Sequence, residues 1–313
     1  MTRLEVEAFL AIIRYGSITA AAEKLYVTQP ALSRRIRAME KELGYELLVR
    51  NKGVRTVQLT EEGKAFIAVA EKLCYLYREA AAISNINQKP VLHLSSIGSV
   101  STYLLPNVLH SFLQSQIYNL CFHQHHSFEA YRYVESGLVD IALISDDMYA
   151  KGVITVPAFQ EPFVLAGGES WQGVKIVHPK QLNPKREIRL PWNPEFDTWH
   201  EKWFDVTVYP NVSLDQMSLM EEFLTGENWA VVPLTVAKRL KRGGLHTCRI
   251  QEGPEDRIIY YLVPENRKQE IVGHFLGLLH QELVSIGGVK SFLTGPPSDS
   301  KSWAPEKLSA ILS

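Results

Sequence analysis

One face of a short helix near the N-terminus carries the side chains best suited to recognition chemistry. Residues 28–43 predict a helix, with Thr28 as N-cap and Pro30 in the first turn, where the missing N–H of proline costs nothing. Its apolar residues recur every three or four positions and share one face, at Leu32, Ile36, Met39 and Leu43. The opposite face offers groups that hydrogen-bond to bases and phosphates, at Gln29, Ser33, Arg34 and Arg37. This pattern is typical of a helix that enters a DNA groove.

Two further helices are needed to hold this helix in place. Residues 18–25 predict a short helix with Ser17 as its N-cap, and a tight turn follows it. An upstream helix supplies the third wall of a small core, with Val6, Phe9, Leu10 and Ile13. The arrangement is a helix-turn-helix, in which the N-terminal end of the second helix, with Thr28, Gln29 and Pro30, reaches DNA.

A hairpin with a basic tip is predicted next. Apolar runs at 47–49 and 54–59 flank Asn51-Lys52-Gly53, which indicates the wing of a winged helix-turn-helix. Its cations would follow phosphates or enter the minor groove: Arg50, Lys52 and Arg55. The alternative is a three-helix core with solvated arginines. It is disfavoured because seven of the ten Lys and Arg residues in 1–60 fall between Arg34 and Arg55, where three glutamates oppose them.

About the first 85 residues resemble LysR-type transcriptional regulators. The resemblance rests on Phe9, on the run GSITAAAEKLYVTQPALSRRIRAMEKELGYELLVR at 16–50, and on Leu-Thr-Glu-Glu-Gly at 59–63. It implies that the recognition helix contacts DNA through Gln29, Pro30, Ser33 and Arg34, and the wing through Arg50. Leu-Val at 48–49 departs from the family, which usually has a phenylalanine there, and should alter packing under the wing more than binding.

A long linker helix is predicted over 60–86, capped by Thr60 with Glu61 and Glu62 near its positive end. Apolar residues then recur every 3.5 residues on average, at Phe66, Val69, Leu73, Leu76, Ala80 and Ile83. This repeat favours a coiled-coil seam, and about 25 residues would make a rod of roughly 38 Å. The alternative is an amphipathic helix packed on its own domain. The resemblance favours a seam between two chains, which would space two DNA-binding heads.

Composition suggests where a polyanion would bind. At 313 residues the chain is long enough for two or three domains. Residues 1–90 hold 14 basic and 10 acidic residues, whereas the remainder holds 19 basic and 24 acidic residues. Only the N-terminal part therefore looks suited to a polyanion.

The three cysteines form no motif, and no signal peptide is seen, which together predict a reducing cytoplasm. No apolar run is long enough to span a membrane, so no membrane association is expected.

Strand and helix patterns alternate from residue 91, which predicts a parallel βαβαβ unit. A second such unit is predicted from a strand at 205–212, a helix from Leu214 and a strand at 229–233, and a strand at 257–264 returns to the first unit. Two lobes joined by two crossings resemble periplasmic binding proteins, as the family resemblance also implies. The expected fold is therefore multidomain: an all-α winged helix-turn-helix at 1–59, the linker helix, and a two-lobed α/β effector domain at 91–286. Lobe I would take about 91–160 and 264–286, lobe II about 161–263, and 287–313 would be a flexible tail.

Ligands of open α/β sheets bind beyond the strand C-termini, against helix N-termini. That rule selects Ser99, Ser101 and Thr102 after the first strand, with a helix from about Ser101, and His126, Ser127, Trp192 and Asn193 elsewhere. The resemblance assigns effector contacts to Ser99 and Ser127. Hydroxyls and free amides suit a carboxylate or another small anion, although serines at helix starts are commonly only caps. The many aromatic residues of lobe II could indicate an aromatic effector, but helix packing explains Phe196, Trp199 and Trp203 more simply.

No metal, cofactor or catalytic residue is predicted. His123 and His125 would share a strand face, but no thiolate or carboxylate has matching spacing, and a metal site normally needs three or four ligands. Cys74 and Cys121 are interpreted as core residues.

The prediction is a sequence-specific DNA-binding transcriptional regulator of the LysR type, modulated by a small-molecule effector. Its partners would be a double-stranded DNA operator, the effector, a second chain through the linker helix, a further pairing into a tetramer, and RNA polymerase. One alternative is an architectural DNA-binding protein without an effector, whose DNA bending no small molecule would change. Another is an enzyme fused to a DNA-binding head, although the sequence holds no Gly-x-Ser-x-Gly, P-loop or dinucleotide motif.

Overall fold

We describe a computed structural model of the chain over residues 1–49, 57–83, 89–205, 207–242, 244–265 and 269–294. The chain divides into an N-terminal unit that ends at Gln88 and a C-terminal unit that begins at Lys89. Each unit has its own apolar core. Within the described ranges, no helix combines the length and apolar character needed to cross a membrane.

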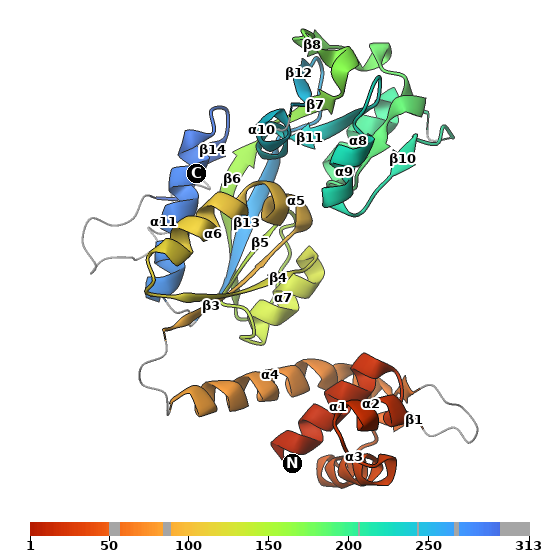
Figure 1. The fold of residues 1–313 in the computed structure, drawn as a ribbon, viewed down its shortest axis with the longest axis vertical. Helices are drawn as coiled ribbons and strands as arrows, with labels where there is room; N and C mark the ends of the chain where they lie inside the picture. The colour runs from red at the N-terminus through yellow and green to blue at the C-terminus, as the bar shows by residue number, and fades with distance from the viewer. Residues whose placement is uncertain (50–56, 84–88, 206, 243, 266–268, 295–313) are drawn as a thin grey trace. The chain divides into compact units, whose positions relative to one another are not determined.

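The N-terminal unit is the predicted helix-turn-helix. It contains α1 (Arg3–Tyr15), α2 (Ile18–Lys24) and α3 (Gln29–Leu43), followed by the antiparallel pair β1 (Leu48–Val49) and β2 (Gln58–Leu59) (Figure 1). The three helices bury a common core that includes Val6, Phe9, Ile12, Leu32, Ile36 and Met39. The predicted apolar faces of α1 and α3 are therefore confirmed. The tip of the wing, with Arg50, Lys52 and Arg55, lies outside the described residues.

Polar side chains fix the ends of these helices as predicted. Ser17 Oγ accepts from the Ala20 amide at 3.1 Å, and Thr28 Oγ1 accepts from the Ala31 amide at 3.4 Å. Glu40, which the sequence did not single out, is 6% exposed, and its Oε1 accepts from the amides of Leu47 and Leu48 at 2.9 and 3.2 Å. This carboxylate ties the end of α3 to the first strand of the wing.

The linker helix α4 runs over Glu61–Ile83, and Thr60 Oγ1 caps it by accepting from the Gly63 amide at 2.9 Å. A Cβ at Gly63 would lie 2.1 Å from the Leu47 carbonyl oxygen, so this approach requires glycine. The predicted seam is wrong at Phe66 and Leu73, which pack in the core of the head; the Phe66 and Phe9 ring centroids are 5.4 Å apart. Val69 and Leu76 are 50% and 47% exposed and leave an apolar stripe on the helix.

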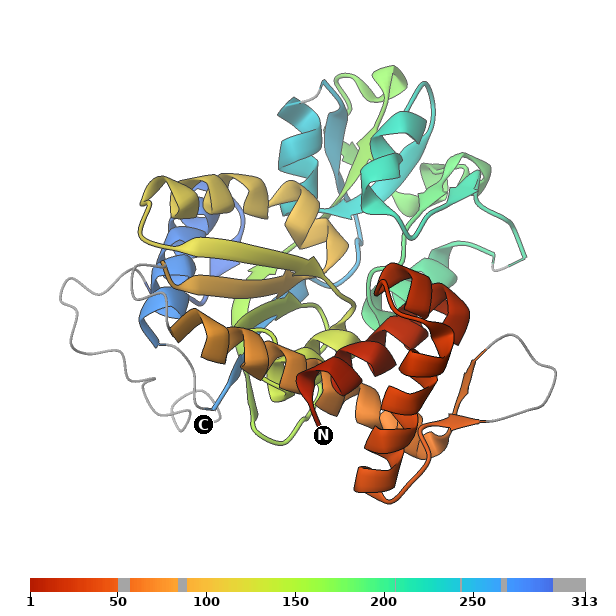
Figure 2. The same cartoon turned by 60° about the horizontal axis from the view of Figure 1, so that its bottom comes forward.

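A six-stranded sheet organises the first lobe of the C-terminal unit, in the order β14-β6-β13-β5-β3-β4 (Figures 1 and 2). Strands β3 (Val91–Ser96), β4 (Asn119–Gln124) and β5 (Ile141–Ile144) are parallel, as predicted. Strands β6 (Val153–Glu161), β13 (Arg257–Pro264) and β14 (Lys290–Ser291) run antiparallel to their neighbours. Helices α5 (Gly98–Tyr103), α6 (Leu105–Gln114) and α11 (Gln269–Ser285) contribute to the core on one face, and α7 (Ser127–Glu135) covers the other.

The second lobe has a four-stranded sheet in the order β11-β7-β12-β8. These strands are β7 (Phe163–Gly167), β8 (Ile176–Val177), β11 (Trp229–Pro233) and β12 (His246–Ile250), and a separate pair joins β9 (Ile188–Arg189) to β10 (Val212–Ser213). The helices are α8 (Pro194–Trp203), α9 (Met220–Phe223) and α10 (Leu234–Arg242), with single turns η1 to η4 at 169–171, 179–181, 184–186 and 217–219. Much of the aromatic content is core, since Phe196, Trp199, Phe204 and Trp229 are buried together.

Several sequence predictions fail in this unit. Lobe II is not a parallel unit, because β7 is antiparallel to both β11 and β12. The predicted strand at 205–212 is reduced to β10 at 212–213, since its alternating residues find only the short β9 as a partner. The lobe II boundary at 263 is wrong, because β13 pairs along its whole length with β6 in the first sheet.

The predicted flexible tail is wrong for its first part. Lys290 and Ser291 pair with β6 as β14, and Leu293 is 8% exposed in the core of the first lobe. The Gly and Ser content of this segment suggested mobility. The outer edge of β6 is open to pairing, however, and it supplies backbone hydrogen-bond partners for Lys290 and Ser291. Residues 295–313 are outside the described chain. We hereafter use lobe I for 89–161 and 257–294, and lobe II for 162–256.

Removal of the Glu40 carboxylate should destabilise the head. Glu40→Ala leaves two buried amides without their acceptor, so the free energy of unfolding should fall by about 1–3 kcal/mol. Glu40→Gln keeps an oxygen acceptor and should lose less. Thermal unfolding of the full chain measures this, with Glu46→Ala as an exposed control on the same helix-to-strand connection. Equal melting of Glu40→Ala and Glu46→Ala would contradict the role of Glu40.

Candidate functional site

The N-terminal half of α3 presents the predicted DNA-binding side chains. Thr28, Gln29, Pro30, Arg34 and Arg37 are exposed, and Ser33 is half-buried. Gln29 Nε2 donates to Ser33 Oγ at 3.1 Å, and Arg34 Nε donates to the Pro30 carbonyl at 3.4 Å. The structure therefore gathers these residues on one solvent-facing surface, on the side of α3 opposite Leu32 and Met39.

The chemistry of this surface suits nucleic acid. An amide and a hydroxyl lie together at the helix start, where they can pair with base edges, and two guanidinium groups follow one and two turns later. Helix N-termini also favour phosphate, because the first amides lack partners within the helix and the helix dipole is positive there. Glu40 is the acidic residue of α3 nearest to this surface in the sequence, and its carboxylate is buried against the Leu47 amide. It therefore adds no exposed negative charge beside Arg34 and Arg37.

A buried ion pair lies at the boundary between the two lobes. Arg257, 3% exposed, opens β13, and Glu161, 0% exposed, closes β6 directly opposite. Arg257 Nε donates to Glu161 Oε1 at 2.9 Å, and Nη2 lies 2.8 Å from the same oxygen without the alignment of a hydrogen bond. Glu161 also accepts from the Thr235 amide at 2.7 Å, in the first turn of α10. A buried charge pair is tolerated only where further hydrogen bonds accompany it, as the Thr235 amide does for Glu161.

This ion pair brings together two of the predicted effector residues. Arg257 Nη1 donates to Ser99 Oγ at 3.1 Å, and the guanidinium carbon lies 5.4 Å from the centre of the Trp192 ring. The indole of Trp192 in turn donates to the Val231 carbonyl at 2.8 Å. Ser99 from lobe I and Trp192 from lobe II therefore meet on one arginine. Arg257 and Glu161 were not predicted from the sequence, although each is a charged residue at the end of an apolar strand.

The helix after β3 begins at Gly98, three residues earlier than predicted. Ser99 is thus inside α5 and 3% exposed, and Ser101 Oγ donates to the Gly98 carbonyl at 3.0 Å, while Thr102 is half-buried on the same helix. A Cβ on Gly98 would lie 3.3 Å from Met217 Cγ in lobe II, so the start of α5 approaches the other lobe closely.

The remaining predicted effector residues have other partners. Ser127 is not a cap, because its hydroxyl donates to Asp146 Oδ2. Asn193 caps α8 by accepting from the Phe196 amide at 2.9 Å, and the His126 side chain is exposed. Within the described residues, no contact joins any of these three to Arg257.

Tyr103 makes a further contact between the lobes that was not predicted from the sequence. Its hydroxyl donates to the Met217 carbonyl at 2.9 Å. Burial, and then the nearby Glu221, raises the pKa of Tyr103.

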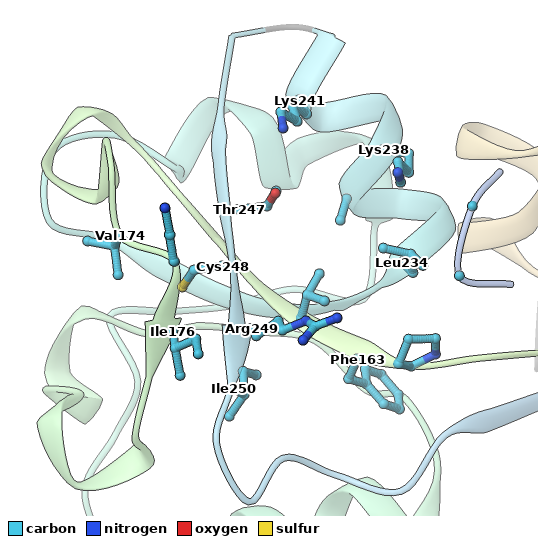
Figure 3. A pocket seen from close by; sticks show the side chains of 16 residues that line it. Phe163, Val174, Ile176, Leu234, Lys238, Lys241, Thr247, Cys248, Arg249 and Ile250 are labelled. Carbon is cyan, nitrogen blue, oxygen red and sulfur yellow. The ribbon is translucent and has the colours of Figure 1, made fainter.

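A pocket of about 800 Å³ lies on lobe II, beside the turn that follows α11 (Figure 3). Its apolar walls come from Phe163, Ile176, Leu234 and Ile250, and its basic groups are Lys175, Lys238, Lys241 and Arg249. Such a pocket suits an amphipathic anion, and it is a second place where an effector could bind. Cys248 also lines it, but burial raises the pKa of this thiol to about 11, so it is protonated at neutral pH.

The histidines of β4 differ from the expectation. His123 and His125 do share a face, with ring centroids 5.7 Å apart, but Cys121 Sγ lies 3.2 Å from His123 Nε2. The argument that no thiolate has matching spacing is therefore wrong, and Cys121 is half-exposed rather than a core residue. His125 is bonded through Nδ1 to Ser95 Oγ at 2.9 Å, and burial, then His123, lowers its pKa.

Two family models match the chain. Residues 4–64 match the bacterial regulatory helix-turn-helix protein of the lysR family, and residues 87–284 match the LysR substrate binding domain. The chain belongs to the LysR family. The recognition-helix surface lies in the first matched region, and the Arg257–Glu161 pair lies in the second.

Relatives within the LysR family share sequence over part of their length. The dual regulator OxyR of Escherichia coli K12 is 28% identical over 195 residues, which cover 59% of this chain and 62% of OxyR. BenM of Acinetobacter baylyi is 35% identical over 109 residues, covering 34% and 35%. The first curated relatives are matched over 48 to 62% of their lengths. Full-length CbnR, solved with its target DNA, shares the fold at 20% identity and a TM-score of 0.64, covering 90% of this chain and 100% of CbnR.

Removing one of the two buried charges at the lobe boundary should destabilise the C-terminal unit. Arg257→Met leaves Glu161 buried without its counter-charge, so the free energy of unfolding should fall by about 3–5 kcal/mol. Glu161→Gln together with Arg257→Met should recover part of that loss, since neither charge then remains. Denaturant unfolding gives the double-mutant cycle, with Arg132→Met as the exposed control. Additive losses in the double variant would contradict coupling of the pair.

Proposed function

We propose that this LysR family member is a sequence-specific DNA-binding transcriptional regulator whose operator binding or DNA bending responds to a small molecule. The observation that carries the proposal is the exposed face of α3, where Gln29, Ser33 and Arg34 stand together at the helix start. Base edges specify sequence and phosphates position the protein, and this face offers groups for both.

The linker helix supports a dimer as the DNA-binding form. Val69, Leu76 and Ala80 are exposed apolar positions on α4, separated by seven and four residues, so they lie on one side of the helix. Pairing of this stripe with a second chain would remove it from water and set the spacing of two half-sites. We also propose that two dimers pair into a tetramer through their C-terminal units and that the regulator contacts RNA polymerase.

The effector is proposed to bind where Ser99, Trp192 and Arg257 meet. Both lobes contribute side chains there, so a ligand that fits only one relative position of the lobes would shift their equilibrium. Glu161 already neutralises Arg257, and an anionic effector would therefore gain little from that arginine alone. The proposed ligand is a small carboxylate or aromatic compound held mainly by hydroxyls and by the indole face.

Substitution on α3 should weaken operator binding selectively. Ser33→Ala and Arg34→Ala should each cost about 1–3 kcal/mol on the cognate duplex if the lost contact is to a base. The cognate duplex is obtained by selection from a random library with wild-type protein, and fluorescence anisotropy then gives the affinities. Arg132→Ala, on α7 of the C-terminal unit, is the control. Unchanged binding would contradict the role of α3, and equal losses on random duplex would restrict the contact to phosphate.

Effector binding should be measurable as a rise in melting temperature of the full chain against aromatic and aliphatic carboxylates. For a compound that raises it, Ser99→Ala and Trp192→Ala should weaken the shift while operator binding without the compound is retained. Lys238→Ala, in the lobe II pocket, should respond like wild type. The reverse pattern, loss in Lys238→Ala alone, would place the effector in the lobe II pocket instead.

A further inference from the structure

A cluster of metal-binding side chains lies on lobe I, apart from both sites described above. His93 on β3 and Cys121 and His123 on β4 bring two imidazoles and one thiol together, with one ligand atom from each all within 4.8 Å of one another. None of the three takes part in the Arg257–Glu161 network, and α3 belongs to the other unit.

The strand register explains why these residues meet. Strands β3 and β4 are parallel neighbours at one edge of the sheet (Figure 1), and their register makes His93 the direct partner of Cys121. His123 follows Cys121 by two residues and so projects to the same face. The His93 backbone is also fixed from the other side, because its amide donates to Asp140 Oδ2 at 2.8 Å. The cluster is thus built on regular strands rather than on a loop.

The donor set and its spacing suit zinc. Zinc binds histidine nitrogen and cysteine thiolate at about 2.0–2.3 Å in a tetrahedral arrangement, which places donor atoms roughly 3.3–3.7 Å apart. Cys121 Sγ and His123 Nε2 are already 3.2 Å apart. The widest separation, within 4.8 Å, would need to shorten by roughly 1 Å on coordination. His93 and Cys121 are half-buried and His123 is exposed, so an ion can enter from solvent.

We propose that His93, Cys121 and His123 form a zinc site at the β3–β4 edge of lobe I, with water in the fourth position. Binding would release the thiol proton of Cys121 to solvent as the thiolate coordinates the ion. The ion would link β3 to β4 directly. These strands lead into α5 and α7, so the site would stiffen the part of lobe I from which Ser99 projects.

The test uses full-length protein that has been stripped with a chelator and titrated with Co²⁺ as a spectroscopic probe. We expect a thiolate-to-cobalt absorption band that saturates at one ion per chain and is lost when Zn²⁺ is added. Cys121→Ser should abolish the band, and His93→Ala or His123→Ala should weaken binding by at least about tenfold. Cys248→Ser and the exposed His110→Ala are matched controls that should keep it. No thiolate band in wild type, or an unchanged band in Cys121→Ser, would overturn the site.

A second measurement needs no variant. Zn²⁺ should slow alkylation of Cys121 by iodoacetamide in the folded wild-type chain, because the coordinated thiolate is shielded, while Cys74 serves as an internal reference on the other unit. Peptide mass spectrometry reports both sites in one sample. Equal labelling of Cys121 with and without Zn²⁺ would overturn the proposal, whatever the variants show.

Discussion

The C-terminal unit depends on one buried charge pair. Glu161 and Arg257 face each other at the point where β6 leaves lobe I and β13 returns to it. An ion pair in this position costs desolvation, which is tolerable only because Thr235 and Ser99 supply further hydrogen bonds. The same contacts join the first turn of α10 in lobe II to α5 in lobe I. Fold and candidate effector site therefore share their central residues, and a change that disturbs one disturbs the other.

The head is held together by a different principle. Four of the helix ends in the head are fixed by a capping side chain or a glycine: Ser17, Thr28, Gly44 and Thr60. The apolar faces then need only a small core, centred on Phe9 and Met39. Leu32 and Ile36 anchor α3 in the core of the head, so the opposite, exposed face of α3 contributes little to core packing. The side chains proposed to contact DNA can therefore be polar without a loss of buried apolar contacts.

Local patterns were sufficient for much of the fold and for the exposed face of α3 that is proposed to bind DNA. Caps at Thr28 and Thr60 and the strands at 229–233 and 257–264 were predictable, because capping side chains and apolar runs act over a few residues. Pairing was not, since Arg257 and Glu161 are 96 residues apart, and the register that places His93 beside Cys121 joins separate strands. The wrong strand at 205–212 and the wrong tail at 287–294 have the same origin: whether a segment becomes a strand depends on whether a sheet edge is open to it. Of the proposed effector residues, only Ser99 and Trp192 share a partner, and that partner was absent from the prediction.

The outward connection between the lobes passes through a single residue, Pro162, which separates β6 from β7. Its carbonyl is held by the Leu234 amide at 2.9 Å, at the first residue of α10. The proline ring fixes φ and leaves ψ as the one soft torsion there. The return connection runs over residues 251–256, and β13 pairs with β6 from its first residue, Arg257. Relative rotation of the two lobes would therefore concentrate at these two connections, and a ligand held at the boundary would act on the backbone torsions of a few residues.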